Sequence, residues 1–219
     1  MDLSNKTISF LGDSITEGVG VKNNKNRYDN IIKNSLKLKT VYNYGIGGTK
    51  IAYQSQPSKL PREDLYFCGR AYDIYPDSDV IIVFGGTNDY GVGDACFGDM
   101  NDDTPKTFCG GVEFLMSFLK ERYPKSEIIF LTPARRQDDE TSSRDMRKAS
   151  DAKPLKEYAE VIKLKAKKYN ILVIDVYNEL KVNPNLETDR IKYAPDGLHL
   201  NDEGHKLLAE LVMLYLKQL

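Results

Sequence analysis

The sequence contains no tryptophan, only two histidines and only three cysteines among its 219 residues. Any reaction that needs an imidazole therefore has two candidates, His199 and His205. The cysteines, Cys68, Cys96 and Cys109, are odd in number and none has the spacing of a metal site. This pattern argues against a disulfide framework and against a zinc site. We expect free thiols in a reducing compartment and no bound metal.

Long apolar runs and an excess of one charge are also missing. No segment approaches the roughly 18 apolar residues that a membrane helix requires. The formal net charge is −1, so bulk charge does not favour nucleic acid or an anionic membrane as a partner. The opening MDLSNKTISF lacks a basic region followed by an apolar stretch. We expect a cytoplasmic protein, although a secreted chain that had lost its leader would read the same.

What the sequence does contain is an alternation of strand-like and helix-like segments. Short apolar or β-branched runs predict five strands, at residues 8–11, 41–44, 80–84, 128–131 and 172–175. Several of them are apolar throughout, as in strands covered on both faces. Between them, apolar residues at helical spacing predict helices near residues 28–35, 108–123, 155–169 and 202–216, with Thr104 and Pro105 as the cap and first turn of the second.

This alternation predicts an α/β protein, a three-layer α/β/α sandwich around a mainly parallel five-stranded sheet. The length suits a single domain that occupies residues 1–219. Sheets of this kind place their active sites beyond the C-terminal ends of the strands. The residues that follow each predicted strand are therefore the first place to look for chemistry.

Four short, polar, glycine-containing stretches occupy such positions or precede the last predicted helix. They read GDSITEG (12–18), NYGIGGTK (43–50), FGGTNDYG (84–91) and PDGLHLNDEGH (195–205). We expect the first three to bring Ser14, Gly48 and Asn88 to one edge of the sheet. The fourth supplies Asp196 and His199.

These residue types are the ones that a serine hydrolase requires. A serine hydroxyl needs a base to take its proton, and a turn from Asp196 to His199 would orient the imidazole toward Ser14. The backbone N–H groups of Ser14 and Gly48 and the Asn88 side chain are candidate donors to an oxyanion. Each residue also has an ordinary structural explanation.

The ordinary explanations involve caps and turns. A serine after a strand commonly caps a helix, and asparagine and aspartate commonly form turns. Gly47 is the alternative to Gly48 as a donor, because the register rests on one short motif. We interpret His205 as a surface residue of the last helix.

The four stretches together resemble the SGNH, or GDSL-type, esterases and lipases. The family's blocks are matched, in order, by Gly12-Asp13-Ser14-Ile15, by Gly48, by Gly86-Thr87-Asn88-Asp89 and by Asp196-Gly197-Leu198-His199. The blocks span residues 8–205, nearly the whole chain. The resemblance implies a flavodoxin-like fold and ester hydrolysis through an acyl-serine intermediate, which requires no cofactor. The other common serine-hydrolase pattern, G-x-S-x-G, is absent around Ser14.

Two further loops are expected to shape the substrate site. Residues 89–103 are long, glycine-rich and acidic, and residues 132–151 carry four arginines, at positions 135, 136, 144 and 147. We name Arg135 or Arg136 as a cation that contacts substrate. Asp13 and Asp89 are further candidates, although turn formation is the simpler interpretation of Asp13.

We therefore expect a serine esterase that acts on short-chain acyl esters, acetyl esters first, with carbohydrate as a candidate alcohol. The alternatives are a lipase or thioesterase for longer acyl chains and a binding module that keeps the pocket without turnover. A flavodoxin-like nucleotide or phosphate binder ranks last, because GDSITEG has no P-loop lysine. The sequence leaves a homo-oligomer open.

Overall fold

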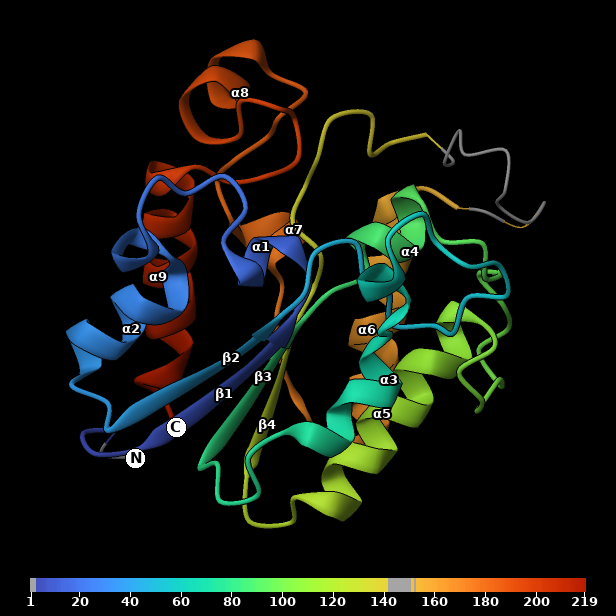
Figure 1. Cartoon of the computed structure of the whole chain (residues 1–219), viewed down its shortest axis with the longest axis horizontal. Helices are drawn as coiled ribbons and strands as arrows, with labels where there is room; N and C mark the ends of the chain where they lie inside the picture. Colours follow the sequence, from blue (N-terminus) through green and yellow to red (C-terminus); the bar gives the residue numbers. More distant parts are fainter. Residues whose placement is uncertain (1–2, 142–150, 152) are drawn as a thin grey trace.

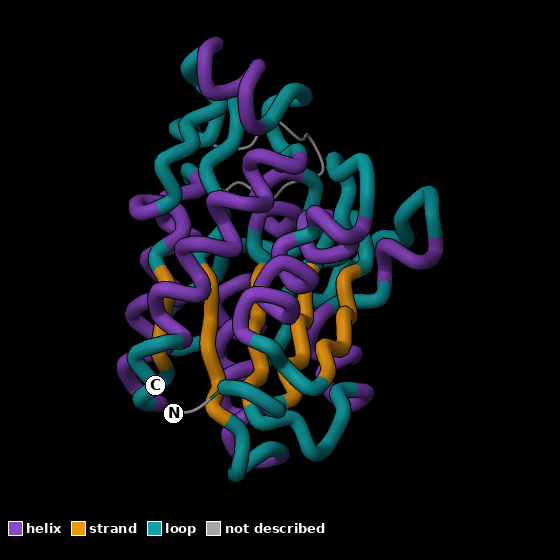
Figure 2. Tube along the Cα trace, turned by 90° about the vertical axis from the view of Figure 1, so that its left-hand side faces the viewer, coloured by secondary structure: helices purple, strands orange, loops and turns teal. Residues whose placement is uncertain are grey.

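The structure is a computed structural model that describes residues 3–141, residue 151 and residues 153–219. Its centre is a sheet of five parallel strands in the order β2-β1-β3-β4-β5 (Figures 1 and 2). The strands are β1 (Thr7–Gly12), β2 (Thr40–Gly45), β3 (Val80–Phe84), β4 (Glu127–Leu131) and β5 (Leu172–Ile174). Each predicted strand agrees with the structure to within one residue at either end, and the predicted parallel sheet is confirmed.

Four longer helices also lie where their apolar stripes predict them. They are α2 (Tyr28–Leu36), α5 (Phe108–Arg122), α6 (Leu155–Tyr169) and α9 (Asp202–Leu216). The predicted cap of α5 is wrong, because the hydroxyl of Thr107 accepts the N–H of Gly110 at 3.1 Å and caps the helix three residues later. Short helices, which the sequence periodicity does not predict, lie at α1 (Ser14–Glu17), α3 (Phe67–Arg70), α4 (Thr87–Gly91), α7 (Val176–Glu179) and α8 (Glu187–Tyr193).

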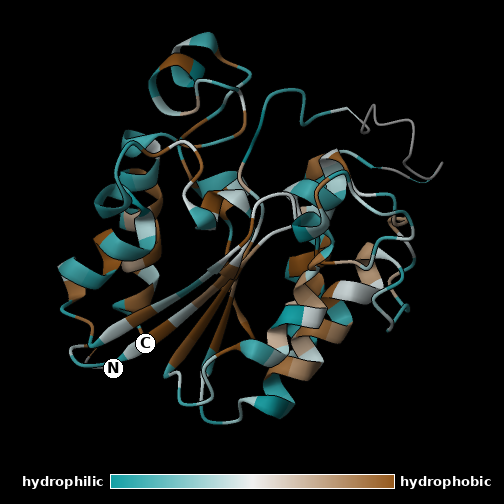
Figure 3. Cartoon of the chain, in the orientation of Figure 1, coloured by the Kyte–Doolittle hydropathy of each residue, from teal (hydrophilic) through white to brown (hydrophobic). Residues whose placement is uncertain are grey.

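Helices cover both faces of the sheet and make the predicted three layers. One apolar core joins α3, α5 and α6 to one face, and a second core joins α2 and α9 to the other (Figure 1). Neighbouring residues of one strand enter opposite cores; in β1, Phe10 packs into the second core and Leu11 into the first. Figure 3 shows the resulting hydrophobic colouring of the central strands. Burial on both faces explains why these runs are apolar throughout.

The strand register places the C-terminal ends of β1, β2 and β3 side by side. Gly12 at the end of β1 pairs with Gly45 of β2 on one side and with Phe84 of β3 on the other. The segments that follow these three strands therefore leave the same edge of the sheet. Figure 1 shows α1 and α4 at this edge, where β1 and β3 end.

The first helix packs directly on the ends of β1 and β2. A β-carbon at Gly12 would lie 2.0 Å from the Thr16 hydroxyl, and one at Gly45 would lie 2.2 Å from the backbone nitrogen of Glu17. Only glycine permits this close approach. The two glycines thus fix where Ser14 begins its helix.

None of the described helices is long and apolar enough to cross a membrane.

Candidate active site

Ser14, His199 and Asp196 form a continuous chain of hydrogen bonds. Ser14 is the first residue of α1, and its Oγ lies 2.9 Å from Nε2 of His199. The other ring nitrogen, Nδ1, lies 2.6 Å from Oδ2 of Asp196. The first residue follows β1 and the other two precede α9, so the fold joins segments 185 positions apart in the sequence. The arrangement that the sequence predicts for these three residues is thus present.

The turn that carries Asp196 also orients its carboxylate. Oδ1 accepts the backbone N–H groups of Leu198 at 2.9 Å and of His199 at 2.7 Å, which leaves Oδ2 for the imidazole. Partial burial alone would raise the pKa of Asp196, but the bonds from the ring and backbone of His199 and from Leu198 outweigh it and lower the pKa. Asp196 therefore remains ionised well into the acidic range. An ionised Asp196 keeps the proton on Nδ1 and leaves Nε2 to accept the Ser14 proton.

Backbone and amide donors face the same place as the Ser14 hydroxyl. Within the described part of the chain, the backbone N–H groups of Ser14 and Gly48 donate to no acceptor. The Asn88 amide donates one hydrogen to the carbonyl of Thr49 at 3.0 Å, which leaves its second hydrogen for a ligand. The Gly47 N–H, in contrast, donates to Oε2 of Glu17 at 2.7 Å. Of the two glycines, Gly48 therefore has the available donor.

All of these groups border one cavity of about 950 Å³. Its wall comprises Ser14, Val19, Gly47, Gly48, Lys50, Ser58, Lys59, Leu60, Arg62, Glu63, Asn88, Val92, Leu198 and His199. The volume lies near the upper end of the roughly 300–1,000 Å³ that is usual for small-molecule sites. The cavity thus has room for a substrate beside the serine and its donors.

Glu17 is a functional candidate that the sequence reasoning missed. It lies one helical turn beyond Ser14, and its carboxylate binds both the Gly47 N–H and the guanidinium of Arg62. These contacts tie the loop that carries Gly48, whose φ of +75° favours glycine, to the helix that carries Ser14. A carboxylate three residues after the serine was the available signal. It is not specific, because acidic residues are common in first helical turns.

We expect Glu17→Ala to lower kcat about 10-fold with little change in KM. The loss is smaller than the roughly 10²–10³-fold that follows removal of an oxyanion donor, because the substitution loosens the Gly48 loop and leaves its N–H in place. Steady-state kinetics on a chromogenic ester measure both constants. Glu17→Gln is the matched control, since its amide oxygen still accepts the Gly47 N–H and should restore most of kcat. A change confined to KM would contradict this positioning role.

Asp13 and Asp89 do not lie where a substrate contact requires. Asp13 is buried, and its Oδ1 accepts the N–H of Ile15 at 3.0 Å as the cap of α1. Asp89 is also buried, and its two oxygens accept the N–H groups of Ile51 and Ala52, each at 2.9 Å. Neither carboxylate borders the cavity. The hydrogen bond of Asp13 instead holds the start of α1, which carries Ser14, and those of Asp89 hold residues 51 and 52 in the loop after Gly48.

The buried Asp13 makes stability depend on pH. Burial raises the pKa of Asp13 from 3.8 to about 7. Between these values the folded chain keeps a proton that the unfolded chain has lost, so the stability contributed by Asp13 falls as the pH rises through this window. The fall in the free energy of unfolding amounts to up to about 4 kcal/mol between pH 4 and pH 8. We expect Asp13→Asn to remove it.

Urea unfolding of both proteins at several pH values provides the measurement. Subtraction of the two curves cancels the other titrating groups, provided that the Asn amide keeps the Ile15 bond. Curves of unfolding free energy against pH that run parallel for the two proteins would show that Asp13 is ionised throughout.

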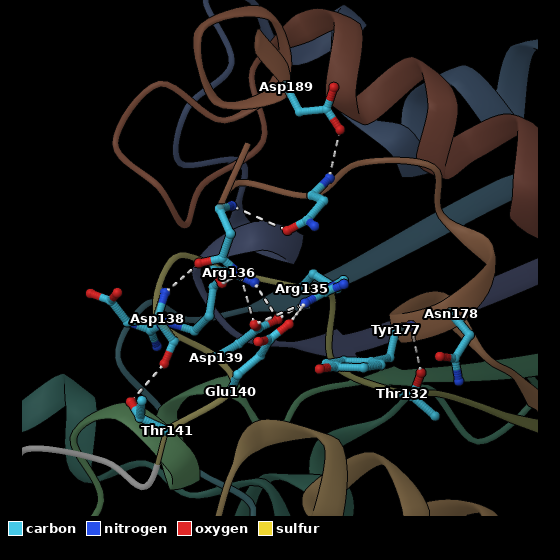
Figure 4. Close-up of polar contacts among 12 residues, drawn as sticks. Thr132, Arg135, Arg136, Asp138, Asp139, Glu140, Thr141, Tyr177, Asn178 and Asp189 are labelled. Carbon is cyan, nitrogen blue, oxygen red and sulfur yellow. Dashed lines mark hydrogen bonds and ion pairs between the residues drawn. The ribbon is translucent and has the colours of Figure 1, made fainter. Parts of the chain in front are cut away.

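Arg135 and Arg136 do not border the cavity either, and Figure 4 shows the protein groups around them. The Arg135 guanidinium binds Asp139 at 3.1 Å and Glu140 at 2.7 Å, and lies over the ring of Tyr177. Nη1 of Arg136 donates to the carbonyl of Thr87 at 3.2 Å. Neither arginine therefore lies in the wall of the cavity, where we expected a cation to contact substrate. Positions 144 and 147 lie outside the described residues.

His205 is buried, not on the surface as expected. Its Nδ1 accepts the N–H of Tyr28 at 3.2 Å, and its ring stacks on that tyrosine. Burial lowers its pKa to about 4. The signal was present in the sequence, because His205 shares a helical face with Leu208, Ala209 and Val212, which fill the same core. His205 has a structural role, and His199 is the histidine at the serine.

Known proteins match both the sequence and the fold. A sequence profile of the GDSL-like lipase/acylhydrolase family matches residues 10–207. A GDSL esterase/lipase of Arabidopsis thaliana is 27% identical over 146 residues, which are 63% of this chain and 58% of the plant protein. The chain thus spans less than two thirds of that relative's length.

Two solved structures illustrate the likeness of fold. A protein from Lactobacillus plantarum superposes with a TM-score of 0.82 at 25% identity, over 98% of both chains. An acetyl xylan esterase superposes with a TM-score of 0.61 at 22% identity, over 95% of this chain and 98% of the other. The profile covers most of the sequence, and the fold agrees. The chain therefore belongs to the GDSL-like lipase/acylhydrolase family, a family of carboxylic ester hydrolases.

Proposed function

We propose that the protein hydrolyses carboxylic esters with Ser14 as nucleophile and His199 as general base. The observation that carries this proposal is the 2.9 Å contact between Ser14 Oγ and His199 Nε2, backed by the 2.6 Å contact from Nδ1 to Asp196. His199 takes the hydroxyl proton as Oγ attacks the ester carbonyl. It then returns the proton to the leaving alcohol, and water repeats the two steps on the acyl-serine.

The negative charge that develops on the carbonyl oxygen requires donors. The backbone N–H groups of Ser14 and Gly48 and the free amide hydrogen of Asn88 fill this role in our proposal. They are held before substrate arrives, because α1, the Glu17 contact and the Thr49 contact fix them. Donors fixed in advance stabilise the transition state without reorganisation.

For the substrate we propose a short-chain acyl ester of a small molecule or a carbohydrate, with acetyl as the first acyl group to test. Of the fourteen described residues that border the cavity, eight have polar or charged side chains, which can hydrogen-bond to a hydroxylated alcohol. An acetyl xylan esterase shares the fold, and its name is a reason to include acetylated sugars.

A longer acyl chain is the second candidate. Val19, Leu60 and Val92 border the cavity and are more than two fifths exposed. Exposed apolar side chains beside a reactive serine would bind an alkyl chain. A lipase or thioesterase activity is therefore worth testing against the short-chain proposal.

A series of 4-nitrophenyl esters from acetate to dodecanoate, run beside acetylated xylose and a matched acyl thioester, separates these candidates. We expect kcat/KM to be highest at two to four acyl carbons, with the Ser14→Ala protein as the blank for each substrate. An optimum at eight carbons or more would replace the short-chain proposal with the lipase candidate. If the protein hydrolyses none of the esters in the series, the proposed activity itself is overturned.

A further inference from the structure

Lys50 is a buried cation in the wall of the proposed substrate cavity. It lies two residues after Gly48, and the same cavity borders Ser14, His199 and Lys50. The residue is only 3% exposed. Its position therefore differs from that of a typical surface lysine, which keeps its ammonium group in bulk water.

The ammonium group of Lys50 has little to compensate its charge. Nζ lies 3.5 Å from Oγ of Ser58, a long contact. Among the described residues, no carboxylate lies within ion-pair distance of Nζ. A buried charge without a partner is costly, and proteins pair such charges or use them to bind a ligand. Lys50 thus forms no direct ion pair with any carboxylate that the structure describes.

The carboxylate of Asp64 is close enough to Lys50 for the two charges to interact, but it already accepts hydrogen bonds from Ser58. Its oxygens accept the backbone N–H of Ser58 at 2.9 and 3.2 Å. Bonds from the hydroxyl and the backbone of Ser58 lower the pKa of Asp64, and the charge of Lys50 adds to this effect. Asp64 therefore acts on Lys50 through Ser58 and at a distance, without closing an ion pair.

The other charges of the cavity wall do not supply the missing anion. Lys59 and Arg62 are further cations, and Glu63 is the one carboxylate among the described residues of the wall. Arg62 is neutralised by Glu17. Glu63 packs against the Gly48 backbone, where a β-carbon would lie 2.6 Å from its Cγ. The balance of charge at the cavity favours a negatively charged ligand.

We propose that Lys50 binds a carboxylate carried by the substrate, so that the protein prefers esters with a second, anionic group. This inference rests on the proposed function, because it assigns a specificity residue to the same cavity. Lysine is suited to the role, since its compact charge binds a single carboxylate without a fixed orientation. Polar groups of this kind set the orientation of ligands in largely preformed sites.

Two pairs of esters test the inference and locate the carboxylate. Mono-4-nitrophenyl succinate and 4-nitrophenyl butyrate differ by a carboxylate on the acyl side. The acetate esters of 4-hydroxybenzoate and of phenol differ by a carboxylate on the alcohol side. We expect the wild-type protein to show a lower KM for the anionic member of one pair.

The charge of Lys50 is then removed or kept. Lys50→Met should raise KM for the preferred anionic ester at least 10-fold and change KM for its neutral partner less than 2-fold. Lys50→Arg should retain most of the preference, and Lys125→Met, which changes an exposed lysine outside the cavity wall, should have no effect. Salt should weaken the preference in the wild-type protein, because the attraction is electrostatic.

The outcomes distinguish the role of Lys50 from the esterase activity on which it rests. Equal effects of Lys50→Met on charged and neutral esters, or no effect on either, would overturn the role of Lys50 while leaving the esterase proposal intact. Ser14→Ala activity equal to that of the wild type would instead overturn the esterase proposal. If Lys50→Met does not fold, competition by succinate against 4-nitrophenyl butyrate in the wild-type protein decides: salt-sensitive inhibition supports the inference, and no inhibition rejects it.

Discussion

Replacing Ser14 by alanine should lower kcat for 4-nitrophenyl acetate by at least about 10⁴-fold, because the attacking oxygen is removed and no acyl-enzyme forms. The fold should survive. Asp13, not Ser14, caps α1 with its side chain, and Ser14 Oγ contacts His199 Nε2. Circular dichroism and thermal unfolding close to those of the wild type are therefore expected alongside the loss of turnover.

The matched control for Ser14→Ala is the change of its partner. His199→Ala should lower kcat nearly as much as Ser14→Ala does. The double variant should lower kcat little further than either single one, because the effects of substituting residues that act as a unit are not additive. His205→Asn provides the contrast, since this buried histidine does not border the cavity and should alter stability more than the chemical step. Retention of more than a tenth of wild-type kcat by Ser14→Ala would reject Ser14 as nucleophile.

Asp196→Asn should produce the second largest loss, about 10³-fold in kcat. The amide oxygen of the new residue would keep the bonds from the N–H groups of Leu198 and His199. Its NH₂ group would then face Nδ1 of His199 and oblige that nitrogen to accept a hydrogen bond. The ring proton would move to Nε2, which faces Ser14 and would no longer accept its proton.

The expected loss is below the roughly 10⁴-fold that a fully enclosed aspartate can show. The Asp196 side chain is 55% exposed, so water partly replaces the missing charge. Asp202→Asn is the matched control, because this nearby carboxylate binds the Lys22 backbone and Asn26; it should change kcat less than 2-fold. Wild-type kcat in Asp196→Asn would show that the carboxylate does not set the tautomer.

Much of the scaffold could be predicted from local pattern. The strands read as continuous apolar runs because both faces of the sheet are covered, and the long helices carry one apolar stripe each. The loops of the site could be assigned because parallel strands place their carboxyl ends on one edge. The partners Asp196 and His199 lie within one turn of each other, so their contact is local and needed no knowledge of the fold.

The residues that resisted prediction are those whose role depends on a distant partner. Nothing near Arg135 in the sequence shows that Tyr177 lies under it, and nothing near Asp89 shows that it accepts the N–H groups of Ile51 and Ala52. Lys50 is unusual only because its surroundings bury it without an ion pair to any of the described carboxylates. Such properties come from packing between segments that the chain order keeps apart.

The central claim is that His199 activates the Ser14 hydroxyl, and covalent labelling by a fluorophosphonate tests it most directly. The reagent attacks an activated serine, and tandem mass spectrometry of the digested protein locates the adduct. We expect one adduct per chain, on Ser14, formed at least about 100-fold more slowly when His199 is alanine. An adduct on another residue, or equal rates of labelling with and without the imidazole, would contradict it.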